Sequence, residues 1–414
     1  MIAAAPPDRR PATGTRARKR VALLVETSSG YGRDVLAGIT RFLRMHDDWS
    51  VFLEQRDLDR SPPEWLRDWN GDGVISRTTT PEFASIADRA DWPLVEITDR
   101  GLRQADVRSD DEQIGRLAAE HLYERGYRRF AFCGFEKEAW SSRRERGFLD
   151  YVRRVDRVDG ESPDRNRGLQ CEIHHGVWRG ADVPAWSDVP TWDEEQIRLN
   201  EWLAKIPRPF GVMASNDVQG QQVLDACATL GLAVPEEVAV VGVDDDDLLC
   251  RLSSPPLSSV IPDAEGVGYR AAELLAKRMN GERTPETPEL IPPLGIACRQ
   301  STDAVAIADA GVAAALHYIS QHACRGISVD DVVRNASISR STLERKVRKH
   351  LGRTPQEEIR QVQIKRTCEL LQTTDLTVER IAALCGFEHP EYLHVVFKRL
   401  VGKTPGQFRA DTAA

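Results

Sequence analysis

Residues 338–355 read ISRSTLERKVRKHLGRTP, and residues 387–405 read FEHPEYLHVVFKRLVGKTP. The two segments share apolar positions and an ending, since Leu343 and Leu393 are 50 residues apart and so are Pro355 and Pro405. A pattern that recurs at such a period indicates one supersecondary unit used twice. In each copy a short polar break separates apolar residues at helical spacing. The sequence therefore predicts two helix-turn-helix units, at about 328–350 and 377–398.

The second predicted helix of the first unit is strongly basic. Six Lys or Arg residues and one Glu lie between Arg340 and Arg353, around an apolar stripe of Leu343 and Val347. Ser339 is placed to cap this helix. Side chains in the first turn of such a helix can read base edges, while flanking basic residues hold phosphates. The charges alone fit a solvated helix face equally well, but the duplication favours DNA binding.

The segment from about Gly311 to Arg409 resembles the DNA-binding domain of the AraC family, through Gly386-Phe387, Phe397-Lys398 and Gly402-Lys403-Thr404-Pro405. The resemblance implies seven helices, a long linking helix at Thr354–Leu371, and double-stranded operator DNA as the partner. By match to the family, the base-contacting positions are Arg340, Ser341, Glu344 and Arg345, followed by His389, Pro390, Glu391 and His394. Lys349 is expected to hold phosphate. In the second unit Pro390 and Val395 stand where the family often has polar residues.

Length and charge indicate more than this one domain. The 414 residues suggest two or three domains, and the net charge of −8 is unevenly spread. Residues 309–414 contain 16 Lys or Arg and 12 Asp or Glu, whereas the remainder contains 40 and 52. An acidic body with a basic end fits a regulator that contacts nucleic acid through one domain.

The sequence shows no sign of export or of a membrane segment. The eight cysteines form no Cys-x-x-Cys pair or zinc spacing, so free thiols in a reducing compartment are expected. Residues 1–19 are rich in Pro, Ala and Arg and lack hydrophobic periodicity, which predicts a disordered basic tail. No apolar run reaches the length of a membrane span, and the start lacks a signal-peptide core. We therefore expect a cytoplasmic protein without membrane contact, metal or cofactor.

From Arg20 onward the chain alternates between strand and helix patterns. Strands are expected at the following ranges: 21–26, 50–54, 73–76, 93–97, 129–133, 211–214 and 238–243. Strands that alternate with helices predict doubly wound parallel sheets, whose ligands bind beyond the carboxyl ends of the strands.

The body resembles the periplasmic-binding-protein fold of the LacI/GalR regulators. The shared motifs are Arg144-x-x-Gly147-Phe148, Ala214-Ser215-Asn216-Asp217, Val240-Val241-Gly242-Val243-Asp244, Pro255-Pro256-Leu257-Ser258-Ser259-Val260 and Gly268-Tyr269-Arg270. The fold class implied is an α/β two-lobed body (type I) followed by an all-α double helix-turn-helix domain. The body would span 20–302, with lobes at about 20–108 with 263–288 and 109–262 with 289–300. A linker at 303–310 and the DNA-binding domain at 311–414 would follow.

A sugar-sensing body joined to a C-terminal AraC-type domain resembles the xylose-responsive activators. The resemblance implies a homodimeric activator of pentose utilisation genes, which answers to D-xylose or a related sugar and works with RNA polymerase. A different sugar or small ligand remains open, as does activation against repression. A periplasmic-type sugar carrier is disfavoured by the DNA-binding end.

Three charged residues near strand ends are the principal candidates for holding a sugar. Arg144 would donate to paired hydroxyls, and Asp217 and Asp244, each just past a strand, would accept from them. Tyr31, Trp140 and Glu26 are weaker candidates for stacking or hinge contacts. Singly, each has a structural alternative as a cap, turn or ion-pair residue; the matched positions together favour a binding site.

Enzymatic and metal-binding interpretations find little support. Gly30-Tyr31-Gly32 follows a predicted strand, but Val35 stands at the third glycine position of a dinucleotide fingerprint. The acidic run 244–247 lacks the spacing of a calcium loop. No Gly-x-Ser-x-Gly elbow is present, and Cys133 and His121 lack the context of a nucleophile. The sequence therefore favours a binding protein over an enzyme.

Overall fold

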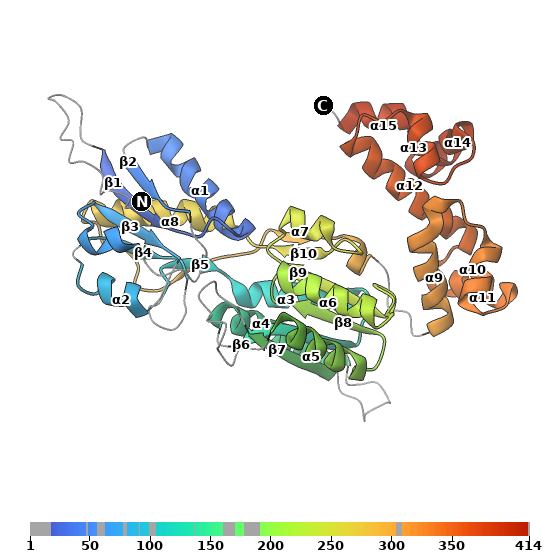
Figure 1. Ribbon diagram of the computed structural model, residues 1–414, viewed down its shortest axis with the longest axis horizontal. Helices are drawn as coiled ribbons and strands as arrows, with labels where there is room; N and C mark the ends of the chain where they lie inside the picture. The colour runs from blue at the N-terminus through green and yellow to red at the C-terminus, as the bar shows by residue number, and fades with distance from the viewer. Residues whose placement is uncertain are drawn as a thin grey trace. The chain divides into compact units, whose positions relative to one another are not determined.

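The chain folds into two compact units, which are described separately (Figure 1). One unit comprises Met1–Leu230 and Val240–Asp303, and the other Gly231–Ala239 and Ala304–Ala414. The computed structural model describes residues 18–46, 49–55, 63–77, 81–90, 92–98, 105–136, 138–159, 170–177, 191–303 and 309–412. The predicted basic tail lies almost wholly outside these residues, as does most of the predicted linker. No helix of the described ranges is long and apolar enough to cross a membrane.

The first lobe is built on a parallel sheet with the strand order β2-β1-β3-β4. Alternate residues of β1 face opposite layers: Val21 and Leu23 pack with α1 and α8, whereas Ala22 and Leu24 pack with η1 and α2. A strand buried on both faces reads as a continuous apolar run, which explains the sequence signal. The elements are β1 (Lys19–Leu24), α1 (Gly30–His46), β2 (Trp49–Leu53), η1 (Glu64–Asp68), β3 (Gly73–Ser76), α2 (Pro81–Ala87), β4 (Leu94–Glu96) and α8 (Ala264–Met279).

The second lobe is built on a sheet with the order β12-β10-β9-β8-β6-β7. Its edge strand β12 runs antiparallel to β10, whereas β10 with β9, β6 with β8 and β6 with β7 are parallel pairs. The elements are α3 (Asp111–Glu124), β6 (Arg129–Glu136), α4 (Ala139–Asp159), β7 (Gln170–Val177), α5 (Trp192–Lys205), β8 (Phe210–Ala214), α6 (Asp217–Thr229), β9 (Val238–Val243), α7 (Asp247–Leu252), β10 (Ser258–Ile261), β12 (Gly295–Ala297) and η2 (Gln300–Thr302).

Three segments carry the chain between the lobes. Two of them, β5 (Val107–Ser109) and β11 (Glu289–Ile291), pair in parallel as a separate two-stranded sheet. The third is the short connection from β10 to α8, where Asp263 caps the helix by accepting from the Gly266 amide. The confirmed fold class is therefore a two-lobed periplasmic-binding-protein-like body with an all-α domain after it.

Two glycines bring α3 and α4 into close contact. A Cβ on Gly115 would lie 1.9 Å from the Arg144 carbonyl oxygen, and a Cβ on Gly147 would lie 1.9 Å from that of Glu112. Any side chain at either position would force the helices apart. The close approach matters for function because it sets Asp111, at the start of α3, beside Arg144 of α4.

The second unit contains seven α-helices in its described residues, as the sequence predicts. They are α9 (Ala310–His322), α10 (Val329–Ala336), α11 (Arg340–Leu351), α12 (Pro355–Thr373), α13 (Val378–Leu384), α14 (Pro390–Val401) and α15 (Pro405–Thr412), with a short η3 (Ala323–Arg325). Ser328 and Thr354 form capping boxes at α10 and α12. One apolar core joins α9, α10 and α11, and a second joins α12 to α15. Each helix-turn-helix therefore packs on its own core, with α12 between them.

Candidate functional site

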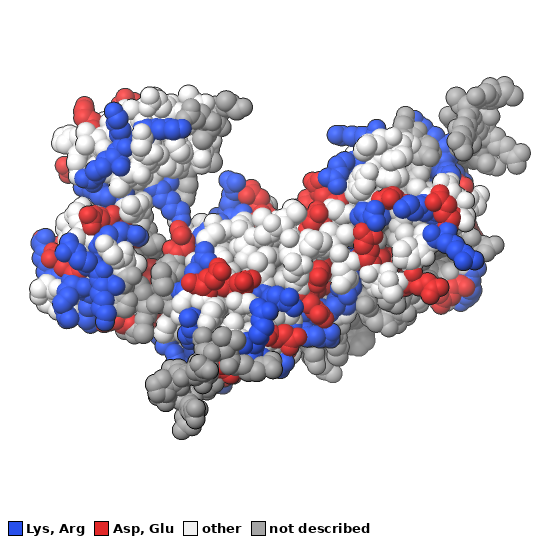
Figure 2. Space-filling model, turned by 180° about the vertical axis from the view of Figure 1, so that it is seen from behind, with Lys and Arg blue, Asp and Glu red and all other residues white. Residues whose placement is uncertain are grey.

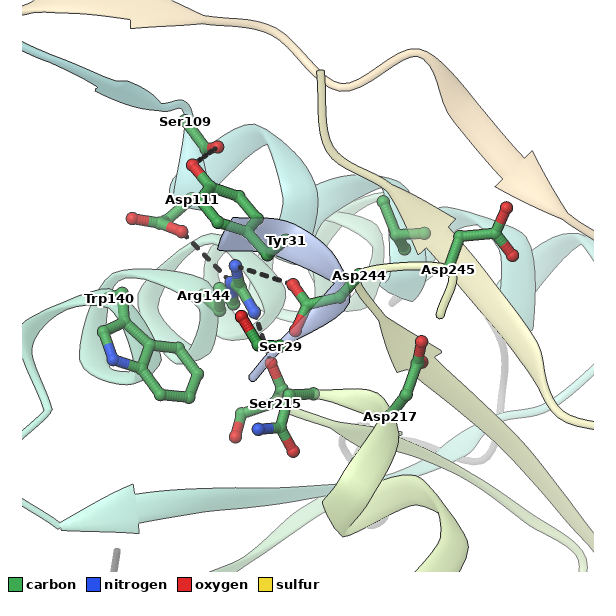
Figure 3. Close-up of polar contacts among 12 residues, drawn as sticks. Ser29, Tyr31, Ser109, Asp111, Trp140, Arg144, Ser215, Asp217, Asp244 and Asp245 are labelled. Atoms are coloured by element: carbon green, nitrogen blue, oxygen red, sulfur yellow. Dashed lines mark hydrogen bonds and ion pairs between the residues drawn. The ribbon is translucent and has the colours of Figure 1, made fainter. Parts of the chain in front are cut away.

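Polar side chains from both lobes converge where the parallel strands end (Figure 3). Glu26 and Arg77 follow β1 and β3 in the first lobe, and Asp244 follows β9 in the second. Tyr31 lies at the start of α1, Asp111 at the start of α3, and Trp140 and Arg144 on α4. We call these seven residues the inter-lobe cluster. The carboxyl ends of parallel strands are where open α/β sheets bind ligands.

Arg144 is the centre of the inter-lobe cluster and is only 4% exposed. Its Nε donates to Asp111 Oδ1 at 3.1 Å, its Nη1 donates to the Ser215 carbonyl at 2.5 Å, and its Nη2 lies 3.6 Å from Asp244 Oδ1. The guanidinium also lies 4.9 Å from the ring centroid of Trp140. Burial disfavours the charged guanidinium, but the two carboxylates offset this and hold the pKa of Arg144 above its ordinary value.

Asp244 presents a carboxylate that its surroundings disfavour. Burial raises the pKa of Asp244 to about 6, while the charges of Arg144 and Arg77 act in the opposite direction. The two arginines come from different lobes, so Asp244 experiences the positive charge of both lobes. An acceptor in this position can take a hydrogen bond from a ligand hydroxyl without losing its ionic partner.

Glu26 and Arg77 form the counterpart in the first lobe. Glu26 is 1% exposed, and its Oε1 accepts from Ser29 Oγ and pairs with the Arg77 guanidinium. Its other oxygen, Oε2, is buried and has no hydrogen-bond partner among the residues that the structure describes. A buried acceptor left unsatisfied is costly, so this oxygen is suited to a ligand hydroxyl.

Tyr31 joins the first lobe to the crossing strand β5. Its hydroxyl lies 2.9 Å from Ser109 Oγ, and the Arg77 guanidinium lies 4.3 Å from its ring centroid. Burial raises the pKa of Tyr31 well above its ordinary value, so the phenol stays neutral. Its hydroxyl is bound to Ser109 of the crossing strand β5, which fits the expected hinge contact.

Asp217 lies apart from Arg144, although the sequence groups the two residues in one site (Figure 3). Its Oδ1 accepts from Ser259 Oγ at 2.7 Å, and its Oδ2 accepts from the Asp246 amide at 2.8 Å and from Cys250 Sγ at 3.3 Å. Both oxygens are thus occupied by protein donors, and the side chain is 1% exposed. This arrangement favours a positioning role, in which Asp217 holds the turn that carries Asp244.

The sequence did not single out Asp111 and Arg77. Asp111 follows the helix cap Asp110 and reads as an ordinary first-turn acid, while Arg77 follows a strand without any motif. The one usable signal for Asp111 was the pair of glycines that brings α3 against α4. The described residues contain no group of three or more His, Cys, Asp or Glu side chains that could hold a metal ion. None of the eight cysteines, all of which lie in the described ranges, forms a disulfide bond.

The helix-turn-helix units present the predicted DNA-contacting residues on one helix each. On α11 the apolar Leu343 and Val347 are buried, while Arg340, Ser341, Glu344, Arg345 and Lys349 are exposed. On and just before α14, His389, Glu391 and His394 are exposed, and Pro390 is half-buried in the first helical turn. Figure 2 shows Lys and Arg side chains gathered over the first helix-turn-helix unit.

Arg340 and Arg345 differ in how the protein engages them. Arg340 Nη1 donates to Asp330 at 2.9 Å and its Nε donates to Glu344 at 3.2 Å, all three side chains being exposed. Arg345 forms no ion pair with any described residue, so its guanidinium is available to a base edge. Lys346, in contrast, binds Asp309 at the start of α9. The recognition helix therefore offers Arg345 and Lys349 more freely than Arg340 or Lys346.

Comparisons with known proteins agree with both units. Residues 20–106 match the XylR N-terminal domain, residues 119–302 a periplasmic binding protein-like domain, and residues 332–411 a helix-turn-helix domain. The chain is 31% identical over 403 residues to the xylose operon regulatory protein of Escherichia coli K12, which covers 95% of this chain and 97% of that one. The protein of the same name from Haemophilus influenzae is 30% identical over 405 residues, covering 95% and 98%.

A solved structure, that of the xylose-binding transcription activator xylR, matches with a TM-score of 0.78 and 29% identity. The match covers 95% of this chain and 98% of that one. The fold and these relatives together define a sugar-responsive, DNA-binding transcription regulator with an AraC-type DNA-binding domain. The chain belongs to the family of the xylose operon regulatory proteins.

Proposed function

We propose that the inter-lobe cluster binds D-xylose or a closely related pentose. The observation that carries the proposal is the combination of a buried donor, Arg144, with two acceptors from opposite lobes. These are Asp244 and the buried Oε2 of Glu26, which no described residue contacts by a hydrogen bond. Paired hydroxyls of a sugar need such alternating donors and acceptors, and the Trp140 ring beside them suits its C–H face. The relatives' names support xylose over other sugars.

The sugar acts by favouring one arrangement of the two lobes. A ligand can shift a conformational equilibrium only if it binds one state more tightly, and groups from both lobes meet such a ligand here. We expect the chain to work in the cytoplasm as a homodimer on paired operator sites. It would activate genes for pentose utilisation, in contact with RNA polymerase.

Isothermal titration of the full-length protein with D-xylose, L-arabinose, D-ribose and D-glucose tests the proposal. One pentose should bind more tightly than the others, and Asp244→Asn should weaken that binding by about 1.5–3 kcal/mol through loss of a charged acceptor. Asp150→Asn, an exposed position on the same lobe, is the matched control and should bind normally. Normal binding by both Asp244→Asn and Glu26→Gln would exclude the inter-lobe cluster as the site.

A second candidate function is a regulator that answers to a different sugar. The donors and acceptors of the inter-lobe cluster suit several sugars, so the same titrations decide which sugar is bound. A hexose that bound while every pentose failed would favour this alternative.

A further inference from the structure

The turn after β9 has an unusual backbone. Asp244 has φ 106° and Asp245 has φ 50°, although neither is glycine. Non-glycine residues in this region are strained and persist only where the surroundings hold them. Here the holding contacts are hydrogen bonds from the Asp245 amide to Ser259 Oγ at 2.9 Å and from the Asp246 amide to Asp217 Oδ2 at 2.8 Å.

The two aspartates of the turn point in opposite directions (Figure 3). Asp244 faces Arg144 in the inter-lobe cluster. Asp245 faces away and pairs with Arg299, whose Nη2 lies 2.7 Å from its Oδ1. Both side chains are largely buried, with exposures of 19% for Arg299 and 23% for Asp245, so water screens this pair only weakly. Asp244 is therefore separated by a single peptide unit from the residue that pairs with Arg299.

Arg299 begins the segment through which the chain leaves the body. This exit segment, Arg299–Thr302, is fastened by Ser258: the Arg299 amide donates to Ser258 Oγ at 2.8 Å, and Thr302 Oγ1 donates to it at 2.7 Å. Ser301 Oγ accepts from the Ser258 amide and donates to the Val240 carbonyl. After Asp303 the chain continues towards α9 of the DNA-binding unit.

Ser258 and Ser259 are neighbours on β10, and one binds the exit segment while the other binds the strained turn. Ser259 holds the strained turn through Asp217 and Asp245, whereas Ser258 holds the exit segment. Arg299 spans both, since its Nη1 also donates to the Leu257 carbonyl at 3.0 Å. The turn and the exit segment are therefore connected by hydrogen bonds through β10 and by the direct ion pair.

We propose that Arg299, through Asp245, couples ligand binding at Asp244 to the segment that leads into the DNA-binding unit. This inference rests on the proposed function, because it needs a sugar at Asp244. The strained turn is the element with two arrangements, and a hydroxyl bound by Asp244 favours one of them. The Asp245–Arg299 pair transmits that choice to Arg299–Thr302. Arg299 is thus a positioning residue for the response and contacts neither sugar nor DNA.

Two conservative variants of the full-length chain test the coupling. Asp245→Asn removes the charge while keeping a residue type that tolerates positive φ, and Arg299→Gln removes the guanidinium. Sugar binding is measured by calorimetry with the pentose that binds the wild-type chain. DNA affinity is measured with and without that sugar, on a fragment enriched from random duplexes by the wild-type chain.

Effectors typically change affinity at a coupled site by about 5- to 150-fold. In both variants we expect the ratio of DNA affinity with sugar to DNA affinity without sugar to fall towards one. Sugar binding and sugar-free DNA binding should stay close to wild type. The double variant should respond as the single variants do, because both act through one pair. Arg146→Gln, which breaks an exposed ion pair with Glu112, is the control and should keep the full ratio.

The outcomes separate this inference from the proposed function. A wild-type chain that bound no sugar would overturn both. A wild-type response that survived at full size and midpoint in both variants would overturn the coupling alone. Loss of sugar-free DNA binding in both variants, with normal thermal midpoints, would also overturn it, because Arg299 would then support the DNA-binding unit directly.

Discussion

Asp217 is a buried acid whose surroundings disfavour its charge. Burial and the nearby charge of Asp244 raise its pKa to about 8, although three hydrogen-bond donors partly oppose the shift. The folded chain therefore holds this proton more tightly than the unfolded chain. The contribution of this proton to the free energy of unfolding is fully present below about pH 4 and is lost as the pH rises through about 8.

Asp217→Asn should flatten this dependence. The amide cannot ionise, so the thermal midpoint of the sensing body should fall less between pH 5 and pH 8 than in the wild-type chain. Some slope remains, because the pKa of Asp244 is also raised, to about 6. The midpoint is followed by tryptophan fluorescence, with Asp150→Asn as control. An unchanged slope in Asp217→Asn would show that this carboxyl is already ionised in the folded chain.

At this scale the sequence predicts residue types better than partners. Arg144 and Asp244 were expected in one site, and the structure brings them within 3.6 Å. Asp217 shares their strand-end position, but both of its oxygens accept from protein donors, the Asp246 amide, Cys250 Sγ and Ser259 Oγ. Those donors are remote in sequence, so no local pattern reports them.

We expect the basic residues of α11 to divide between base reading and phosphate contact. Arg345→Ala should weaken operator binding by about 1–3 kcal/mol and relax the sequence preference, if its guanidinium reads a guanine edge. Lys349→Ala should instead weaken binding to all sequences and reduce the salt dependence, because a phosphate contact releases counterions.

Both variants are compared by fluorescence anisotropy on operator and scrambled duplexes at several salt concentrations. Arg334→Ala is a suitable control, since this exposed arginine lies on α10 and pairs with Asp331. An equal, uniform loss from Arg345→Ala and Lys349→Ala would contradict the division between reading and positioning.

Among the strands, β1 to β4, β6, β8 and β9 overlap the predicted ranges, whereas β5, β7, β10, β11 and β12 were not expected. The strands β3 and β9 lie at the predicted residues, and every residue of both is buried. The crossing strands β5 and β11 have three residues each and exist only because they pair with one another. Such pairing joins residues far apart in the chain, so local sequence gives no signal for it.

For the whole molecule, we expect sensing and DNA reading to be separable. A chain ending at Thr302 should bind sugar with normal affinity but show no sequence-specific DNA binding, because both helix-turn-helix units lie beyond it. Calorimetry and anisotropy on this fragment make the test, with the full-length chain as reference. Specific DNA binding by the fragment would refute the domain assignment.

The lobes are discontinuous in sequence, and this affects how the protein is made. The core of the first lobe requires Val267, Ala271 and Leu275 of α8, which leave the ribosome only after most of the second lobe. The sheet of the second lobe is complete only once its edge strand β12 has been synthesised. Domains fold as units during synthesis, so the sensor is completed between Ala264 and Asp303, just before the DNA-binding helices are translated. All of the sensing body is thus synthesised before the DNA-binding helices, and a nascent chain that stalls before α8 would expose the apolar face of the first-lobe sheet to chaperones and proteases.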